Sequence, residues 1–106
     1  MKILFSPEVR TQLKELSEIL YEKEYFGFDD DAYNYVKDLI SDITTSLPNR
    51  IQKTAPDYFS KYGKDMFYVS FHKSSKTQWY VFFNHEEDVF YIRYIGNNHT
   101  CAQYLR

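Results

Sequence analysis

"MFYVSFHKSSKTQWYVFFNHEEDVFYIRYI", residues 66–95, decides how this chain folds. Aromatic and β-branched residues dominate three runs in it, Met66 to His72, Gln78 to Asn84 and Val89 to Ile95, and turn-like breaks separate the runs. Because successive side chains of a strand point to opposite faces of a sheet, the period of two in these runs predicts three consecutive strands.

The lengths of the two breaks predict how these strands pair. The break from Lys73 to Thr77 is odd in length, and it places Phe71 beside Trp79 and Val69 beside Val81. The break from His85 to Asp88 has four residues, and it places Phe83 beside Phe90 and Val81 beside Ile92. Both pairings keep one apolar row in register, which is the consistency expected of a correct assignment.

The same registers predict an opposite face that is aromatic and carries no carboxylate. Its rows should hold Ser70, Tyr80 and Arg93, then His72, Gln78 and Ile95, then Tyr68, Phe82 and Tyr91. Flat rings beside cations suit unpaired bases and phosphates. A covering subunit or exposed tyrosines would explain the face equally well, so a homodimer is also possible.

Two helices are predicted upstream of these strands. Ser6 and Pro7 form a helix start after the short strand "KILF", and Val9, Leu13, Leu16 and Leu20 recur at helical spacing. Three aspartates, Asp29 to Asp31, favour a second helix start, with Val36, Ile40, Ile43 and Leu47 as its apolar stripe before Pro48. One helical turn is expected between Pro56 and Gly63.

The resulting order is strand, helix, helix, strand, strand, strand. This order predicts one α+β domain over residues 1–106, with an antiparallel sheet and both helices on one face.

Composition narrows the class of protein. One cysteine, Cys101, allows no intramolecular disulfide and no thiolate zinc site, and we expect neither a metal nor a cofactor. The start of the sequence, "MKILFSP", is too short in apolar residues for a signal peptide or a membrane span. We therefore expect a cytoplasmic protein without a membrane partner.

The net charge of −2 is unevenly distributed along the chain. Residues 1–46 carry a net charge of −5, whereas residues 47–106 carry +3. This asymmetry indicates an anionic partner for the second half, although small domains often divide their charge in this way.

The last strand runs into a group of side chains that can transfer protons or bind phosphate. Asn97, Asn98, His99 and Tyr104 follow it, and His72 and Arg93 should lie nearby at the edge of the aromatic face. Histidine, arginine, lysine and tyrosine are the groups used when an internal 2′-hydroxyl cleaves a phosphodiester without a metal.

At this point the chain resembles the RelE/ParE superfamily of toxins from bacterial type II toxin–antitoxin systems. The resemblance covers nearly the whole chain and depends on the element order, on "ILFSPEVRTQLKEL" at the start and on "YIRYIGNNHTCAQY" near the end. Gly96 and Tyr104 match the spacing of the glycine and the functional tyrosine that follow the last strand in RelE-like members.

The resemblance implies a compact toxin that a cognate antitoxin wraps and neutralises. RelE-like members cleave messenger RNA on the ribosome, whereas ParE-like members inhibit DNA gyrase and need no nuclease residues. The first activity is our leading hypothesis. The modest basic complement of the chain favours the second, and an inactive relative that binds only an antitoxin is a third possibility.

Under the nuclease hypothesis the site residues divide into two groups. The catalytic candidates are His99, Tyr104, Arg93 and His72, with His99 as the first choice for proton transfer, or alternatively as a residue that bonds the adjacent turn. The candidates for nucleic-acid binding are Lys61, Lys64, Lys73, Lys76, Tyr80 and Tyr91. Cys101 is expected to be structural.

Overall fold

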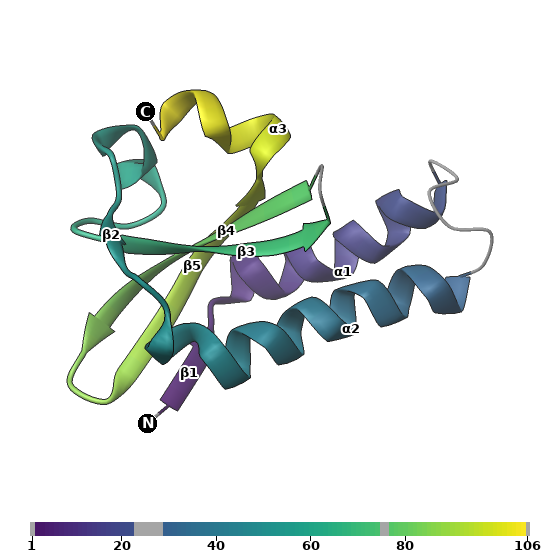
Figure 1. The fold of residues 1–106 in the computed structure, drawn as a ribbon, viewed down its shortest axis with the longest axis horizontal. Helices are drawn as coiled ribbons and strands as arrows, with labels where there is room; N and C mark the ends of the chain where they lie inside the picture. Colours follow the sequence, from purple (N-terminus) through teal and green to yellow (C-terminus); the bar gives the residue numbers. More distant parts are fainter. Residues whose placement is uncertain (1, 23–28, 75–76, 106) are drawn as a thin grey trace.

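The computed structural model describes residues 2–22, 29–74 and 77–105 and has an α+β fold (Figure 1). The long elements follow the predicted order, from β1 (Lys2–Phe5), α1 (Pro7–Glu22) and α2 (Asp29–Ser46) to β3 (Phe67–Ser74), β4 (Thr77–Glu86) and β5 (Val89–Asn97). Short elements complete the chain: η1 (Leu47–Asn49), β2 (Lys53–Thr54), η2 (Asp57–Lys61), α3 (Asn98–Cys101) and η3 (Ala102–Tyr104). Each η element is a 3-10 turn.

The sheet is mixed, so the prediction of an antiparallel sheet is wrong at one edge. Its strand order is β1-β5-β4-β3-β2, and β1 runs parallel to β5 while the other neighbours are antiparallel. The parallel pairing brings the end of β1 beside Ile92, whose carbonyl accepts a hydrogen bond of 3.0 Å from the Ser6 backbone N–H. The α1 helix can therefore begin directly against β5.

The β3–β4 register is as predicted, with Phe71 beside Trp79 and Val69 beside Val81. The predicted β4–β5 register is wrong by two residues, because the turn contains only Glu87 and Asp88 and Phe90 lies beside His85. Glu87 adopts a φ of 54°, the left-handed conformation that tight hairpins require.

A β-bulge in β5 adds a second difference. Phe83 lies opposite Ile92, but the next residue, Phe82, lies opposite Tyr94, so that Arg93 is the additional residue on β5. The bulge reverses the alternation beyond it. Ile95 therefore joins the core beside the helices, where Tyr94 was expected, and Tyr94 lies on the other face.

The larger core lies between the sheet and the two long helices. Ser6 caps α1 by accepting a hydrogen bond of 3.1 Å from the Val9 backbone N–H, as its position predicts. The stripe of α2 differs from the prediction by one residue, because Leu39 is fully buried and Ile40 only half-buried. The side chain of Leu20 lies outside the described residues. The buried residues of this core are Val9, Leu13, Val36, Leu39, Ile43, Leu47, Val69, Phe71, Trp79, Val81, Phe83, Phe90, Ile92 and Ile95.

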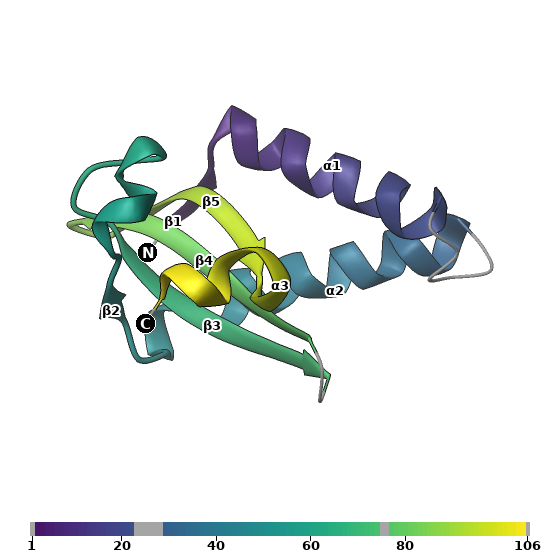
Figure 2. The ribbon, with the colours of Figure 1, turned by 90° about the horizontal axis from the view of Figure 1, so that it is seen from above.

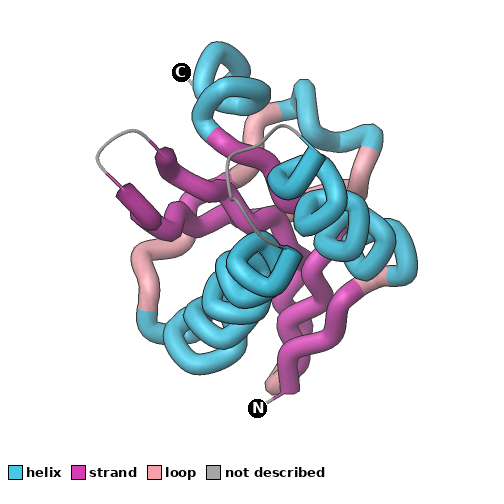
Figure 3. Tube along the Cα trace, turned by 90° about the vertical axis from the view of Figure 1, so that its right-hand side faces the viewer, coloured by secondary structure: helices cyan, strands magenta, loops and turns pink. Residues whose placement is uncertain are grey.

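A second, smaller core covers the opposite face of the sheet. Seen from above, α3 crosses the strands on the side away from α1 and α2 (Figure 2), and the C-terminal turn and α2 lie on opposite sides of the strands in Figure 3. Phe59, Met66, Phe82 and Cys101 are buried there, against half-buried Tyr62, Tyr68, Tyr80 and Tyr94. η2 and the C-terminal turn of the same chain therefore cover part of the face that was expected to be open: Phe82 is buried, while Tyr68, Tyr80 and Tyr91 are half-buried and His72 and Arg93 are exposed.

Candidate functional site

The η2 turn brings a lysine among exposed and half-buried tyrosines from three parts of the chain. Phe59 anchors the turn, because its ring is 1% exposed and stacks on Phe82 with centroids 4.3 Å apart. This burial leaves Tyr58 and Lys61 on the outer side of the turn. We refer to Tyr58, Lys61, Tyr62, Tyr94 and Tyr104 as the tyrosine–lysine cluster.

Tyr58 stacks on Tyr104 from the C-terminal turn. The two rings are parallel within 5° and their centroids lie 3.6 Å apart. Hydrogen bonds from Lys61 and then from Tyr104 lower the pKa of Tyr58, because both stabilise its phenolate form. The contact with Tyr58 raises the pKa of Tyr104.

Lys61 joins two stacked pairs of tyrosines. Its Nζ atom lies 4.0 Å from the centroid of Tyr58 and 5.5 Å from that of Tyr62, and Tyr62 stacks on Tyr94 at 3.9 Å. The Tyr58 hydroxyl raises the pKa of Lys61, so the ammonium keeps its charge over the whole neutral range. Burial raises the pKa of Tyr94, which is therefore a neutral support of the cluster and no proton acceptor.

Arg93 approaches the same turn from β5. A side chain at position 63 would collide with Arg93 Cδ and would lie 3.1 Å from Arg93 Nε, so Gly63 allows the arginine to cross the end of the turn. The guanidinium carbon also lies 5.1 Å from the centroid of Tyr91, within the range of a cation–π contact. Arg93 and Tyr91 are both accessible to a ligand, since the first is exposed and the second half-buried.

The polar residues after β5 have a structural role that explains most of them. Asn97 Oδ1 caps α3 by accepting hydrogen bonds from the His99 and Thr100 backbone N–H groups, and Asn98 Oδ1 accepts one of 3.0 Å from Gln78. The ring of His99 is exposed. His99 therefore contributes its backbone N–H to this turn, and no hydrogen bond of its ring to another described residue is seen.

The two histidines are not joined to the other catalytic candidates. His72 is exposed on β3 opposite Gln78. Within the described part of the chain, no hydrogen bond or ion pair links either histidine ring to Arg93 or Tyr104. The structure places Tyr104 on Tyr58 of η2 and Arg93 against Gly63, two residues after η2, and leaves His72 and His99 outside these contacts.

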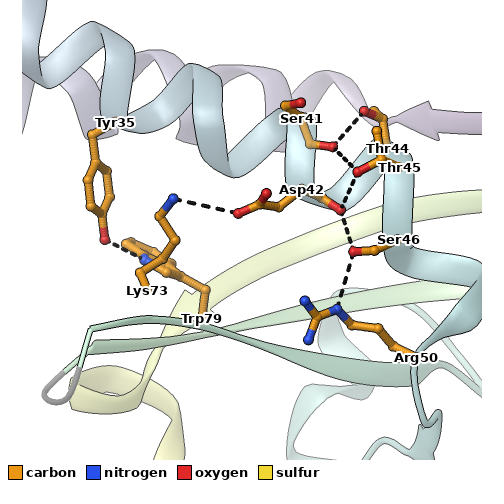
Figure 4. Close-up of polar contacts among 9 residues, drawn as sticks. All are labelled: Tyr35, Ser41, Asp42, Thr44, Thr45, Ser46, Arg50, Lys73 and Trp79. Atoms are coloured by element: carbon orange, nitrogen blue, oxygen red, sulfur yellow. Dashed lines mark hydrogen bonds and ion pairs between the residues drawn. The ribbon is translucent and has the colours of Figure 1, made fainter.

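Lys73 points to the wrong face for the predicted role. Its Nζ lies 3.6 Å from Asp42 Oδ2 and 5.4 Å from the Tyr35 centroid, so it contacts α2 (Figure 4). The cause is the strand period, since Lys73 shares the helix-facing side of β3 with Phe71. The neighbouring hydrogen bond of 2.9 Å from Trp79 Nε1 to the Tyr35 hydroxyl lies on the same side.

The remaining candidates for nucleic-acid binding differ in accessibility. Lys64 is exposed, and its backbone carbonyl accepts a hydrogen bond of 2.8 Å from Asn84. Tyr80 packs in the smaller core, where burial raises its pKa, and only part of its ring can reach a ligand. Lys76 lies outside the described residues.

Cys101 is structural, as expected. It is buried, and burial raises the pKa of its thiol, which keeps the sulfur protonated and unreactive. Among the described residues, no three His, Cys, Asp or Glu side chains gather in a way that could hold a metal ion. No described helix is long and apolar enough to cross a bilayer.

The comparisons with known proteins assign no family to this chain. No family model matches the chain, and neither a curated protein nor a solved structure is significantly similar to it.

Sequence reasoning missed Tyr58 and Tyr62, which contribute two of the four rings around Lys61. The signal was present in "PDYFSKYG", where Tyr58 and Lys61 are three residues apart and would share one side of a helical turn. What the sequence did not show is that Tyr104, 46 positions after Tyr58, completes the stack.

Proposed function

We propose that this chain is a RelE-like toxin of a type II toxin–antitoxin system and that it cleaves ribosome-bound messenger RNA without a metal ion. The observation that carries the proposal is that Tyr104 stacks on Tyr58 with Lys61 4.0 Å from the Tyr58 centroid, while Arg93 lies against Gly63 just after the same turn. Lys61, Arg93 and Tyr104 were all selected from the sequence as site residues for this chemistry.

The chemistry that this site supports is attack of a 2′-hydroxyl on the adjacent phosphate. Lys61 and Arg93 supply positive charge for the crowded phosphorane, whose charge exceeds that of the substrate. The exposed rings of Tyr58 and Tyr104 offer flat surfaces on which an unpaired base can stack. The order of the two long helices and the four longer strands supports the RelE-like assignment. We further propose a cytoplasmic location, where messenger RNA is available.

A protein partner is supported by an apolar groove on the other side of the molecule. The groove encloses about 410 Å³ between α1 and α2, with Phe5, Leu13, Val36 and Ile40 among its lining residues. Its charged lining residues are Arg10, Lys14 and Lys37, and none of the carboxylates in the described part of the chain lines it. In the acidic half of the chain, this charge favours an amphipathic helix with acidic flanks, which we assign to the cognate antitoxin.

The same groove supports a second candidate function, inhibition of a protein target such as DNA gyrase without catalysis. A homodimer through the aromatic face would use the rings that η2 and the C-terminal turn leave half-buried, such as Tyr68, Tyr80 and Tyr91.

Growth arrest on induced expression, with mapping of new 5′ ends in total messenger RNA, tests the proposal. We expect arrest and new ends for the wild type, and a strong reduction of both for Lys61→Met and Arg93→Met. Lys2→Met is the matched control, because this exposed lysine lies on β1, outside both the tyrosine–lysine cluster and the groove. Arrest with intact messenger RNA would refute the nuclease and favour the protein target.

A further inference from the structure

Tyr58 differs from the other described tyrosines in its surroundings. Its ring is 42% exposed at the start of η2, yet Lys61 and Tyr104 hold it in place, with the lysine Nζ 4.0 Å from its centroid and the Tyr104 ring stacked at 3.6 Å. The hydroxyl can therefore be reached by a ligand while its orientation is fixed. Such a combination is what a group that transfers a proton to or from a substrate requires.

The pKa shifts within the cluster favour an ionised Tyr58 beside a protonated Lys61. Lys61 and Tyr104 lower the pKa of Tyr58, whereas contact with Tyr58 raises the pKa of both partners. The Lys61 ammonium lies 4.0 Å from the Tyr58 centroid, and its positive charge favours the phenolate form of Tyr58.

We propose that Tyr58 is the catalytic residue that accepts the proton of the RNA 2′-hydroxyl, with Lys61 as the positioning residue that holds the phenolate. This inference rests on the proposed nuclease function and names a residue that the sequence analysis did not select. The histidines are the obvious alternatives, but neither ring contacts the assembly around η2.

The reaction balances without a co-reactant other than water. The Tyr58 phenolate takes the 2′-hydroxyl proton as the 2′-oxygen forms its bond to phosphorus. The bond from phosphorus to the 5′-oxygen breaks, its electron pair stays on the leaving oxygen, and water protonates that oxygen. The products are a 2′,3′-cyclic phosphate and a 5′-hydroxyl, and Tyr58 returns its proton to the hydroxide that remains.

A base of this kind predicts a particular pH dependence. Below the pKa of Tyr58, the fraction of phenolate rises tenfold for each unit of pH, and the rate of the chemical step should rise with it. Replacing Lys61 by Met removes the first cause of the lowered pKa, so the rising limb should move to higher pH. Lys61→Arg retains the charge and should move it much less.

The experiment is single-turnover cleavage of ribosome-bound messenger RNA by the purified protein, over the pH range that ribosomes tolerate. We expect Tyr58→Phe to reduce the rate by about 100-fold or more and to remove the rising limb. Tyr33→Phe is the matched control, because Tyr33 is an exposed tyrosine of α2, outside the cluster. Thermal melting of both variants checks that they fold.

The outcomes separate this inference from the proposed function. If the wild type cleaves and Tyr58→Phe cleaves at the same rate with the same pH profile, Tyr58 is not the base, while the nuclease stands. If the wild type does not cleave, the nuclease proposal fails and this inference fails with it. An ultraviolet phenolate titration of wild type against Tyr58→Phe gives a second test, independent of cleavage. A Tyr58 that ionises no earlier than an ordinary tyrosine would overturn the proposal.

Discussion

The two faces of the sheet are both covered, but by different kinds of structure. On one face, two long helices bury a mainly aliphatic core that includes Leu39, Ile43, Val81 and Ile92. On the other, short turns from two parts of the chain cover aromatic rings, and several tyrosines remain half-buried. The difference indicates that the first face supplies stability, while the second supplies hydroxyls and cations at the surface.

This division has a physical reason. A tyrosine ring can pack while its hydroxyl stays in water, so a layer rich in tyrosine is both a core and a functional surface. A short 3-10 turn adds few hydrogen bonds of its own and depends on the packing of one anchor residue. In this chain that anchor is Phe59, which holds Tyr58 and Lys61 outward.

The largest expected effect comes from removing a buried ring on each face. Phe83 is fully buried beside the helices, and Phe83→Ala should lower the free energy of unfolding by about 3–5 kcal/mol. Phe59→Ala on the other face should cost about 3 kcal/mol, because the half-buried rings around it can move into the vacated space. Urea unfolding measures both values.

The two variants should differ more in function than in stability. We expect Phe59→Ala to abolish messenger RNA cleavage under conditions where it is still folded, since η2 would no longer hold Lys61 in place. Phe83→Ala should keep cleavage activity in its folded fraction. Equal loss of activity per folded molecule would contradict the division between the faces.

The helix-facing side of the sheet was largely predictable from the sequence, because alternation and helical spacing are local signals. The β3–β4 register and the Ser6 cap are confirmed. The β4–β5 register was not predictable, since it depends on a two-residue turn with Glu87 at positive φ and on the bulge at Arg93. Glutamate rarely adopts a positive φ, and arginine is not a residue type that indicates a bulge.

The candidate site was only partly predictable for a related reason. Arg93, Tyr104 and Lys61 were selected by residue type, but their assembly depends on Phe59 packing against Phe82, a contact between distant parts of the chain. Lys73 was placed in the break between two strands, whereas β3 continues to Ser74 and carries Lys73 on the helix-facing side. His99 was favoured because of its chemistry, and its position in a capped turn was not considered first.

A glycine on the second face offers a smaller and more local test. Gly96 is buried, and a side chain there would collide with Cys101 Sγ and lie 3.2 Å from the Tyr94 ring. We expect Gly96→Ala to lower the free energy of unfolding by about 1–3 kcal/mol through overpacking. Urea unfolding gives the value.

Cys101→Ala tests the cause of that loss. Cys101→Ala removes the sulfur with which the new side chain would collide. The double variant Gly96→Ala/Cys101→Ala should therefore be more stable than the sum of the two single losses predicts. Strictly additive losses would show that the collision with Cys101 is not what makes Gly96→Ala unfavourable.

The smallest expected effect at neutral pH is that of Tyr94→Phe, which removes one hydroxyl from beneath the tyrosine–lysine cluster. Loss of its hydrogen bonding to Tyr62 and Cys101 should cost about 0.5–1.5 kcal/mol. The effect of pH is more informative. Burial raises the pKa of Tyr94 above its ordinary value of 10.0, so the folded protein keeps this proton after the unfolded chain has lost it. The stability from the neutral hydroxyl is present below pH 10.0 and is lost as the pH rises through the folded pKa.

Tyr94→Phe cannot ionise at this position, so it should lose less stability than the wild type between neutral pH and values above the ordinary tyrosine pKa. Tyr33→Phe should follow the wild type, because the exposed hydroxyl of Tyr33 lies outside this core. Urea unfolding of the three proteins at both pH values makes the comparison. If Tyr94→Phe loses as much stability as the wild type, Tyr94 does not make the second face sensitive to alkali. The cause would then be Tyr80 and Cys101, because burial raises the pKa of both groups.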